Sequence, residues 1–256
     1  LRALLPAGCA LAGEPLLTVS VMKQTNLGWL AGRGYNIVAL RIPVTFQNNA
    51  FNYTPVLWEN MADPILTGRE ELGSPKLFAN IPDPLPRNGG YACSADWDGF
   101  RFLELDTTEL REERAPPPAA APLLLYRYFS RTGEWQKADV AQITRAHKGA
   151  APAPVLHEHR VGNGRFAFRA ATWEDMPTQY TFINTLAALP LREFRGARMT
   201  RVSGIADIAA QEDDVSRLEL MRRDIGLDDV AAAEGARDHV AERMRGRLGA
   251  REDAEL

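Results

Sequence analysis

One lysine of this chain stands among apolar residues, where a charged ammonium is poorly solvated. Lys76 follows Pro75 and precedes Leu77 and Phe78. Burial among apolar side chains favours the neutral form of an amine, and a neutral amine can attack a ketone and form a Schiff base. The sequence therefore predicts a nucleophilic lysine at position 76. A lysine at the end of a strand that extends its amine to water is the alternative that this pattern leaves open.

The composition makes this lysine unusual within its own chain. Lysine and arginine together number 30, and only four of them are lysines, namely Lys23, Lys76, Lys137 and Lys148. The chain thus carries most of its positive charge on arginine. A lysine in the most apolar of the basic contexts marks a candidate site, because groups with perturbed ionisation gather at functional sites.

The residues around this lysine form a recognisable motif. Gly68-Arg69-Glu70, followed after four residues by Pro75-Lys76, resembles the signature of the acetoacetate decarboxylase superfamily. Further segments stand in what resembles the family order, at residues 13–16, 42–46, 96–99, 189–191 and 205–208. By this resemblance, Lys76 takes the place of the family's Schiff-base lysine. The resemblance implies no cofactor, and it implies a homo-oligomer, which is usual in that family.

The resemblance also implies a fold. We expect a β-rich α+β protein with a large antiparallel sheet, curved into a cone or barrel that holds Lys76 in its interior. Short strands separated by turns, with few helical runs between them, favour the same class. The predicted domain of this type covers residues 1–210, and helix-forming residues from Glu212 onward predict a C-terminal helical extension over residues 211–256.

Three departures from the family pattern bear on the reaction. Leu77 stands where the decarboxylase has a second lysine, so that burial alone would have to favour the neutral amine of Lys76. Ile37 and Ser20 stand where the decarboxylase has acidic residues, and the chain opens inside the family's first conserved stretch, without the segment that supplies an arginine for the substrate carboxylate. We therefore expect acetoacetate to be a poor substrate.

Several residues are candidates to assist Lys76. Glu70 is the candidate for proton transfer, with Glu71 as an alternative, and Arg69 is a candidate for substrate binding. An Arg69–Glu70 ion pair that fixes a loop is the structural alternative. Tyr35, Tyr53 and Trp58 are candidate walls of the substrate pocket, although aromatic residues on strands often belong to the core.

These residues lead to one predicted function and one rival. We predict a Schiff-base-forming carbon-carbon lyase that acts on a small keto acid through Lys76, by decarboxylation or by aldol condensation and dehydration. The superfamily's aldolase-dehydratases keep the lysine without decarboxylating acetoacetate. The rival is a non-catalytic or ligand-binding descendant in which Lys76 pairs with a bound carboxylate. The first hypothesis requires a neutral amine, whereas the second requires the ammonium.

Charge and composition limit the partners. A formal net charge of −3 gives no basic surface for nucleic acid or for an anionic membrane, and no stretch approaches the ~20 apolar residues of a membrane span. Cys9 and Cys93 are too few for a disulfide framework, which predicts free thiols and a cytoplasmic location. His157 and His159 share a strand face, but no third metal ligand stands near them, so we expect exposed strand residues and no metal.

Strand and turn patterns predict the remaining elements. The loop predicted at residues 111–122 contains Pro116-Pro117-Pro118, and residues 161–165, with Gly162 and Gly164, predict a hairpin loop. A turn at Asp98-Gly99 predicts a second hairpin. The predicted strands cover residues 16–22, 35–46, 100–105, 122–130, 155–161, 165–172 and 198–208.

Overall fold

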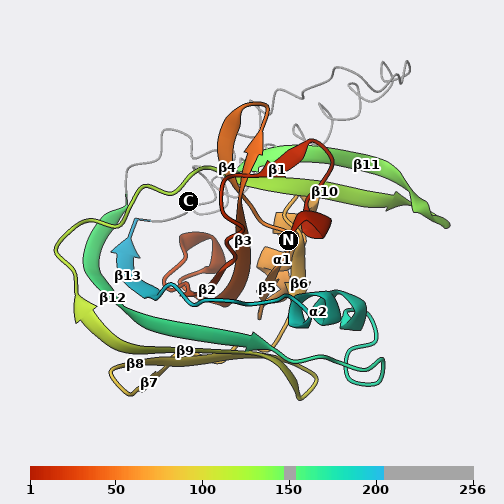
Figure 1. Ribbon diagram of the computed structural model, residues 1–256. Helices are drawn as coiled ribbons and strands as arrows, with labels where there is room; N and C mark the ends of the chain where they lie inside the picture. Colours follow the sequence, from red (N-terminus) through yellow and green to blue (C-terminus); the bar gives the residue numbers. More distant parts are fainter. Residues whose placement is uncertain (147–153, 205–256) are drawn as a thin grey trace, which may run out of the picture. The chain divides into compact units, whose positions relative to one another are not determined.

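The computed structural model describes residues 1–146 and 154–204. Within these ranges the chain forms thirteen β-strands and two α-helices, α1 (Ala62–Glu70) and α2 (Tyr180–Ala187), and two short 3₁₀ turns, Arg2–Leu4 and Gly28–Leu30. The β-rich α+β class predicted from the sequence is confirmed (Figure 1). The predicted helical extension over residues 211–256 lies outside the described residues, as do the boundary at residue 210 and the end of the strand predicted to reach residue 208.

The first sheet is built around one long strand, β3 (Asn36–Phe46), which is mostly buried. The first half of β3 pairs with β2 and β5, and its second half pairs with β1 and β4. All pairs in this sheet are antiparallel except β5 with β6 and β4 with β10. The other strands of the sheet are β1 (Cys9–Leu11), β2 (Thr18–Lys23), β4 (Asn49–Tyr53), β5 (Leu57–Glu59), β6 (Lys76–Phe78), β10 (Leu123–Arg131) and β11 (Glu134–Ala146).

The second sheet is wholly antiparallel and follows the order β13-β12-β9-β8-β7. The hairpin predicted at Asp98-Gly99 is confirmed: both residues have positive φ angles, 48° and 87°, and they join β8 to β9. Figure 1 shows β12 curving alongside β9. The strands are β7 (Leu85–Arg87), β8 (Gly90–Trp97), β9 (Phe100–Glu112), β12 (Val155–Phe168) and β13 (Ala197–Ser203).

The main core joins this second sheet to the β2-β3-β5-β6 part of the first, with α2 contributing as well. Trp58 of β5 is fully buried and packs against Phe102 of β9, with 5.1 Å between the ring centroids. Its indole Nε1 donates a 2.9 Å hydrogen bond to Oε1 of Gln179, beside the first turn of α2. Trp58 therefore ties both sheets and α2 together.

The prediction of a hairpin at residues 161–165 is wrong, since β12 continues through these residues as one strand. The two glycines serve close packing between strands. A Cβ atom on Gly162 would lie 2.6 Å from the backbone oxygen of Thr108, and one on Gly164 would lie 2.7 Å from Cβ of Ala197. A register shift between Val161 and Asn163 accompanies this approach of β12 to β9.

Other sequence predictions have mixed outcomes. The proline-rich stretch forms a loop as predicted, but only from residue 113, because β9 extends to Glu112. The predicted strands do not include β11 or the short strands β1 and β4 to β7, and neither helix was predicted. The helix α1 has Pro64 in its first turn and Gly68 near its end, and both residues have low helix propensity. No helix within the described residues is long and apolar enough to cross a membrane.

The packing of β12 against β9 generates a stability prediction. Gly162→Ala forces a methyl group against the backbone of β9, and overpacking of this kind costs about 1–3 kcal/mol. Gly28→Ala is the matched control, because a Cβ atom there meets no other atom within 4 Å, and its effect should stay within about 0.5 kcal/mol. Urea unfolding of both variants measures the difference; equal stabilities would contradict the close-packing role of Gly162.

Candidate active site

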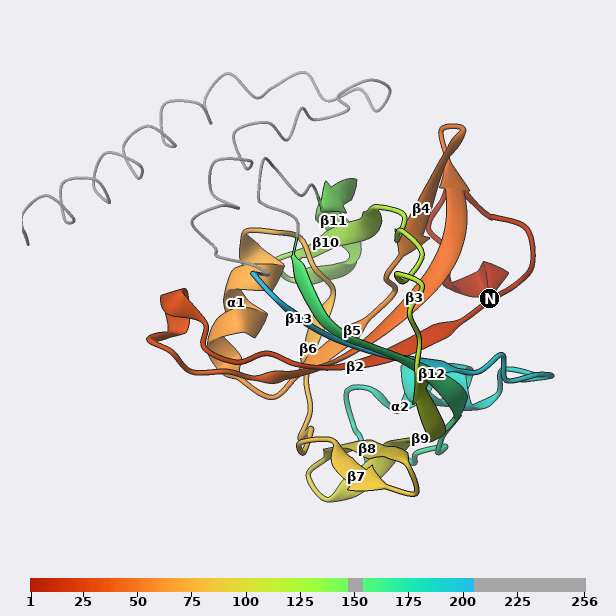
Figure 2. The same ribbon diagram turned by 90° about the vertical axis from the view of Figure 1, so that its left-hand side faces the viewer.

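The position of Lys76 follows from the pairing of two short parallel strands. In the register of β5 with β6, Leu57 lies beside Lys76 and Trp58 lies beside Leu77. Successive residues of a strand point to opposite faces, and Trp58 and Leu77 contribute to the main core. Lys76 and Glu59 consequently share the other face, on the side where α1 lies (Figure 2).

Lys76 and Glu59 form a buried ion pair. The Nζ atom of Lys76 lies 2.9 Å from Oε1 of Glu59 and donates a 2.9 Å hydrogen bond to the carbonyl oxygen of Pro64 in α1. The Lys76 side chain is 12% exposed and that of Glu59 is 1% exposed. The alternative prediction, a lysine at the end of a strand that extends its amine to water, is therefore wrong.

The glycine of the motif makes room for the lysine. A Cβ atom on Gly68 would lie 2.3 Å from Cε of Lys76 and 2.5 Å from its Nζ. Arg69 NH1 donates a 2.9 Å hydrogen bond to the carbonyl oxygen of Lys76, and Ser74 N–H donates one of 2.8 Å to that of Gly68. The motif therefore spans the end of α1, a turn and the start of β6, and its spacing lets Gly68 and Arg69 contact Lys76.

The electrostatics of Glu59 are set by its burial. Burial raises the pKa of the Glu59 carboxyl above its ordinary value, and the charge and hydrogen bond of Lys76 oppose this rise without cancelling it. The second oxygen, Oε2, is buried and has no hydrogen-bond partner among the described residues. Glu59 is therefore a carboxyl group that can hold or release a proton directly beside the lysine amine.

The predicted helpers of Lys76 occupy different places. Glu70 is exposed at the end of α1, and its carbonyl oxygen accepts a 2.7 Å hydrogen bond from Arg127 of β10. No Arg69–Glu70 ion pair occurs in the part of the chain that the structure describes, because Arg69 bonds to the backbone of Lys76 instead. Phe78, which was expected to desolvate the lysine, is 49% exposed.

The three predicted pocket walls are also separated. Trp58 lies in the main core, on the face of β5 opposite to Lys76. Tyr53 lies in a second apolar cluster with Ile42 and Leu124, and burial raises the pKa of Tyr53 to about 12. The pKa of Tyr35 is raised first by burial and second by the negative charge of Glu59, so Tyr35 is within electrostatic reach of the ion pair.

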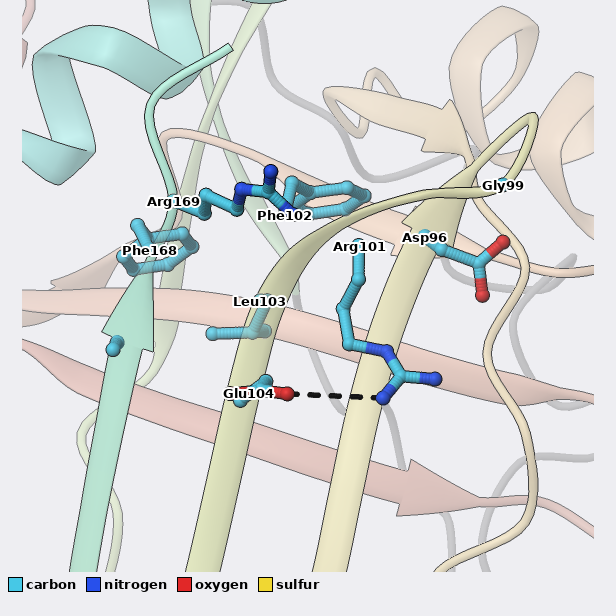
Figure 3. Close-up of a pocket in the computed structure, with 9 residues that line it drawn as sticks. Asp96, Gly99, Arg101, Phe102, Leu103, Glu104, Phe168 and Arg169 are labelled. Carbon is cyan, nitrogen blue, oxygen red and sulfur yellow. Dashed lines mark ion pairs between the residues drawn. The ribbon is translucent and has the colours of Figure 1, made fainter. Parts of the chain in front are cut away.

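Two surface hollows accompany this arrangement, and neither is lined by Lys76. One, of about 340 Å³, is lined by Tyr35, Asn36 and Asn60, among others, where β3 begins and β5 ends. The other, of about 560 Å³, lies beside the β8–β9 hairpin, where Arg101 and Glu104 form an ion pair (Figure 3). The residues that line this second hollow include no lysine, cysteine, serine or histidine.

The histidines are placed differently from the prediction. His157 is exposed, and its Nε2 lies 2.7 Å from Oγ of Ser203, whereas His159 is buried, with Nδ1 2.7 Å from the carbonyl oxygen of Ala115. The expectation of two exposed histidines is wrong for His159, because the loop after β9 covers it. Within residues 1–146 and 154–204, no cluster of three potential ligands could hold a metal ion. Cys9 and Cys93 are free thiols, as predicted.

Glu59 is the site residue that sequence reasoning missed. It lies directly opposite Ile37 in the register of β3 with β5. Ile37 is an apolar residue where the family resemblance implies an acid, and the acids predicted in its place, Glu70 and Glu71, are those nearest to Lys76 in the sequence. Sixteen residues lie between Glu59 and Lys76 in the sequence, and the parallel pairing of their strands brings the two side chains together.

Comparisons with known proteins identify the family of this chain and its fold. The family model for acetoacetate decarboxylase matches residues 1–201. Among solved structures, an acetoacetate decarboxylase is 16% identical, with a TM-score of 0.62, over 78% of this chain and 75% of that one. The acetoacetate decarboxylase of Legionella pneumophila is 14% identical, with a TM-score of 0.59, over 79% of this chain and 78% of that one.

A third solved structure is the enduracididine biosynthesis enzyme MppR in complex with pyruvate. It is 17% identical, with a TM-score of 0.57, over 78% of this chain and 82% of that one. A search among curated proteins gave no match. At these identities the solved structures show a shared fold, and the curved β-rich fold implied by the motif resemblance is confirmed.

The buried ion pair generates a prediction about stability and pH. Lys76→Met leaves Glu59 buried without its cation, and removing one partner of a buried pair costs about 3–5 kcal/mol. A carboxyl whose pKa is raised in the folded protein stabilises the fold at low pH, and this contribution is lost as the pH rises through the raised pKa. The cost of Lys76→Met should therefore be large at pH 8 and small at pH 5.

Urea unfolding at the two pH values measures this cost. The double variant Glu59→Gln with Lys76→Met is the control, because it carries neither charge and its stability should change far less than that of Lys76→Met between pH 5 and pH 8. A cost for Lys76→Met that is the same at both pH values would show that Glu59 does not titrate as proposed.

Proposed function

We propose that this chain, which belongs to the acetoacetate decarboxylase family, is an enzyme. In this proposal, Lys76 forms a Schiff base with a small keto acid. The observation that carries the proposal is the contact between the Lys76 amine and the Glu59 carboxyl, both withdrawn from water. A nucleophile within hydrogen-bond distance of a proton acceptor is the arrangement that amine catalysis requires. Enzymes of this fold, a decarboxylase and MppR, support the assignment as an enzyme.

In the proposed formation of the iminium, Glu59 carries one proton from the amine to the departing water. Glu59 takes one proton from the Lys76 ammonium, and the free electron pair of Nζ then forms a bond to the ketone carbon. One further proton moves from Nζ to the ketone oxygen, Glu59 returns the first proton to the same oxygen, and water leaves. The iminium keeps one hydrogen and the positive charge, beside the carboxylate of Glu59.

The rival function, a binding protein in which Lys76 pairs with a ligand carboxylate, has less support. The Lys76 ammonium already has a carboxylate partner in Glu59 and a carbonyl partner in Pro64. A second carboxylate there would place two buried anions beside one cation, which is unfavourable. A neutral ketone carbonyl brings no such conflict, because the positive charge remains next to Glu59.

The choice between the two reactions that could follow the iminium rests on the residue after Lys76 and on a protein of the same fold. An iminium accepts an electron pair either from a departing carboxylate or from an adjacent carbon–hydrogen bond. Leu77 provides no second cation beside the amine, and MppR, a protein of the same fold, is described with pyruvate. We therefore propose aldol condensation and dehydration as the favoured chemistry and decarboxylation as the alternative. The predicted homo-oligomer and cytoplasmic location, and the predicted role of Arg69 in substrate binding, stay proposals.

Chemical trapping tests the nucleophile. Sodium borohydride with pyruvate, or with acetoacetate, should reduce an imine and add mass to the peptide that contains Lys76. Lys76→Met should abolish the adduct, whereas Lys23→Met, at an exposed lysine paired with Asp83, should leave it unchanged. Glu59→Gln should slow trapping about 100-fold, because general acid–base groups typically contribute 100-fold or more. Intact-mass spectrometry and peptide mapping read the result.

Two results would contradict the proposal. An adduct on any peptide other than that of Lys76 would remove the lysine from the reaction. A wild-type protein that binds keto acids but gives no adduct at any pH would favour the binding function instead.

The glycine of the motif provides an independent test. Gly68→Ala places a methyl group against Cε and Nζ of Lys76, and the flexible lysine side chain must move away from Glu59. The fold should survive, because alanine is favoured over glycine inside a helix by about 0.5–1 kcal/mol. Trapping should fall about 100-fold, since displacement of a reacting group by about 1 Å can have this effect.

The matched control for this variant is Leu66→Ala, at a 56% exposed position of the same helix. Its trapping rate should equal that of the wild type. A Gly68→Ala protein that is folded by circular dichroism and traps keto acids at the wild-type rate would disprove the spacing argument for this glycine.

A further inference from the structure

Tyr35 directly precedes β3, and its side chain lies on the face of the first sheet that carries the ion pair. Its carbonyl oxygen accepts a 2.9 Å hydrogen bond from the N–H of Gln24, which continues the ladder between β2 and β3. The next residue, Asn36, points to the core side, where its Nδ2 donates a 3.0 Å hydrogen bond to the carbonyl oxygen of Ile81. Because successive residues of an extended chain point to opposite faces, Tyr35 shares the face of Glu59.

Tyr35 is a diagonal neighbour of Glu59. Ile37 lies opposite Glu59 in the register of β3 with β5, and the N–H of Asn60 donates a 3.3 Å hydrogen bond to the carbonyl oxygen of Asn36. The pairing thus continues toward Tyr35 beyond the end of β5. Diagonal neighbours across an antiparallel pair are about 7–8 Å apart, which is within reach of an aromatic side chain. The negative charge of Glu59, which adds to the effect of burial in raising the pKa of Tyr35, agrees with this proximity.

The hollow of about 340 Å³ adjoins the same end of these two strands. Tyr35 and Asn60 both line it, and Asn60 directly follows Glu59 in the sequence. Apart from Tyr35, every residue of its lining is polar, charged or a glycine. The two charged residues, Lys23 and Asp83, form an ion pair with each other. The hollow is therefore a polar space of the size that ligand sites have, and its wall carries no net charge that would repel a carboxylate.

Two other approaches to Lys76 are occupied by protein. Gly68 of α1 leaves no room for even one methyl group beside Cε and Nζ, and Nζ is bonded to the carbonyl oxygen of Pro64. The second hollow, of about 560 Å³, is lined by Phe102, and Trp58 packs against that ring in the main core. The core thus separates the second hollow from Lys76, whereas the first hollow lies on the side of the ion pair.

We infer that the hollow beside Tyr35 is the entrance through which the keto acid reaches Lys76, and that Tyr35 limits the size of the molecules that pass. This inference rests on the proposed function and adds the residue that selects among its substrates. Tyr35 belongs to neither apolar cluster, so its ring can turn without disturbing the core. A keto acid with a short side chain passes beside the ring, whereas a bulky one is obstructed by it.

The size limit is tested with two keto acids. Pyruvate carries a methyl group on the ketone carbon, and phenylpyruvate carries a benzyl group. In Tyr35→Ala, the ratio of the borohydride trapping rate with phenylpyruvate to that with pyruvate should rise about 10-fold or more, because even one methylene group can change selectivity by about 10-fold. Tyr35→Phe is the matched control: it keeps the ring, so its ratio should equal that of the wild type. An unchanged ratio in a folded Tyr35→Ala protein, or an equal rise in Tyr35→Phe, would overturn the size limit.

Chemical blocking tests the entrance. Thr25 is an exposed residue in the lining of the hollow, and Thr25→Cys provides a thiol that benzyl methanethiosulfonate converts to a bulky mixed disulfide. This modification should lower the trapping of pyruvate at Lys76 about 10-fold or more, because the benzyl group fills the hollow, and dithiothreitol should restore the rate. Glu104→Cys, in the lining of the second hollow, is the matched control and should trap equally before and after modification. The treated wild type reports any effect of Cys9 and Cys93.

Amine labelling keeps the inference separate from the proposed reaction. Cyanate carbamylates a lysine without forming an imine, and peptide mapping compares its rate at Lys76 with that at the exposed Lys137. Blocking of Thr25→Cys should slow the labelling of Lys76 relative to Lys137, and dithiothreitol should reverse the effect. Equal labelling before and after blocking would overturn the entrance, whatever the trapping shows. Slower labelling in a protein that gives no keto-acid adduct would support the entrance and remove the proposed Schiff base.

The same labelling tests the size limit without a keto acid. Trinitrobenzenesulfonate is a bulky amine reagent, and its rate at Lys76 relative to that of cyanate should rise in Tyr35→Ala and stay unchanged in Tyr35→Phe. A relative rate that is equal in all three proteins would overturn the role of Tyr35.

Discussion

The ion pair between Lys76 and Glu59 is the interaction on which the rest of the site depends. Two opposite charges that are 12% and 1% exposed lose most of their hydration, and their mutual attraction does not reliably repay that loss. The surrounding structure holds them together in spite of this cost. Gly68 leaves space for the lysine stem, Pro64 accepts its hydrogen bond, and Arg69 fixes the lysine backbone. The residues around the pair, rather than the attraction between the two charges alone, therefore hold it in place.

The register of β5 imposes the division between core and site. Trp58 and Glu59 are adjacent in sequence and point to opposite faces of the sheet, one into the apolar core and the other toward α1. A shift by one residue would exchange them and place a carboxylate in the core. The bond from Trp58 to Gln179 and the packing on Phe102 thus fix the position of Glu59 as well. The packing of Trp58 in the core therefore determines which face of the sheet carries Glu59.

The sequence predicted the parts of this protein that depend on local pattern. The lysine and its motif, the long strand β3, the Asp98-Gly99 hairpin and the β-rich class all follow from neighbouring residues. The sequence did not predict the features that depend on contacts between segments far apart in the chain. Gly162 and Gly164 have the composition of a turn, but they accommodate the adjacent strands β9 and β13. Glu59 could not be found for the same reason, since its contact with Lys76 arises from a parallel pairing across a helix.

Glu59 gives the Lys76 amine a different environment from the purely apolar one that the sequence predicts. Leu77 provides no second cation beside Lys76, and the Oε1 atom of Glu59 lies 2.9 Å from the amine instead. Burial raises the pKa of the Glu59 carboxyl, and a carboxylate that is poorly solvated is a stronger proton acceptor than an exposed one. In the proposed reaction, proton transfer from Lys76 to Glu59 turns the two buried charges into a neutral acid and a neutral amine. The amine that this proposed step releases has a side chain that is only 12% exposed to water.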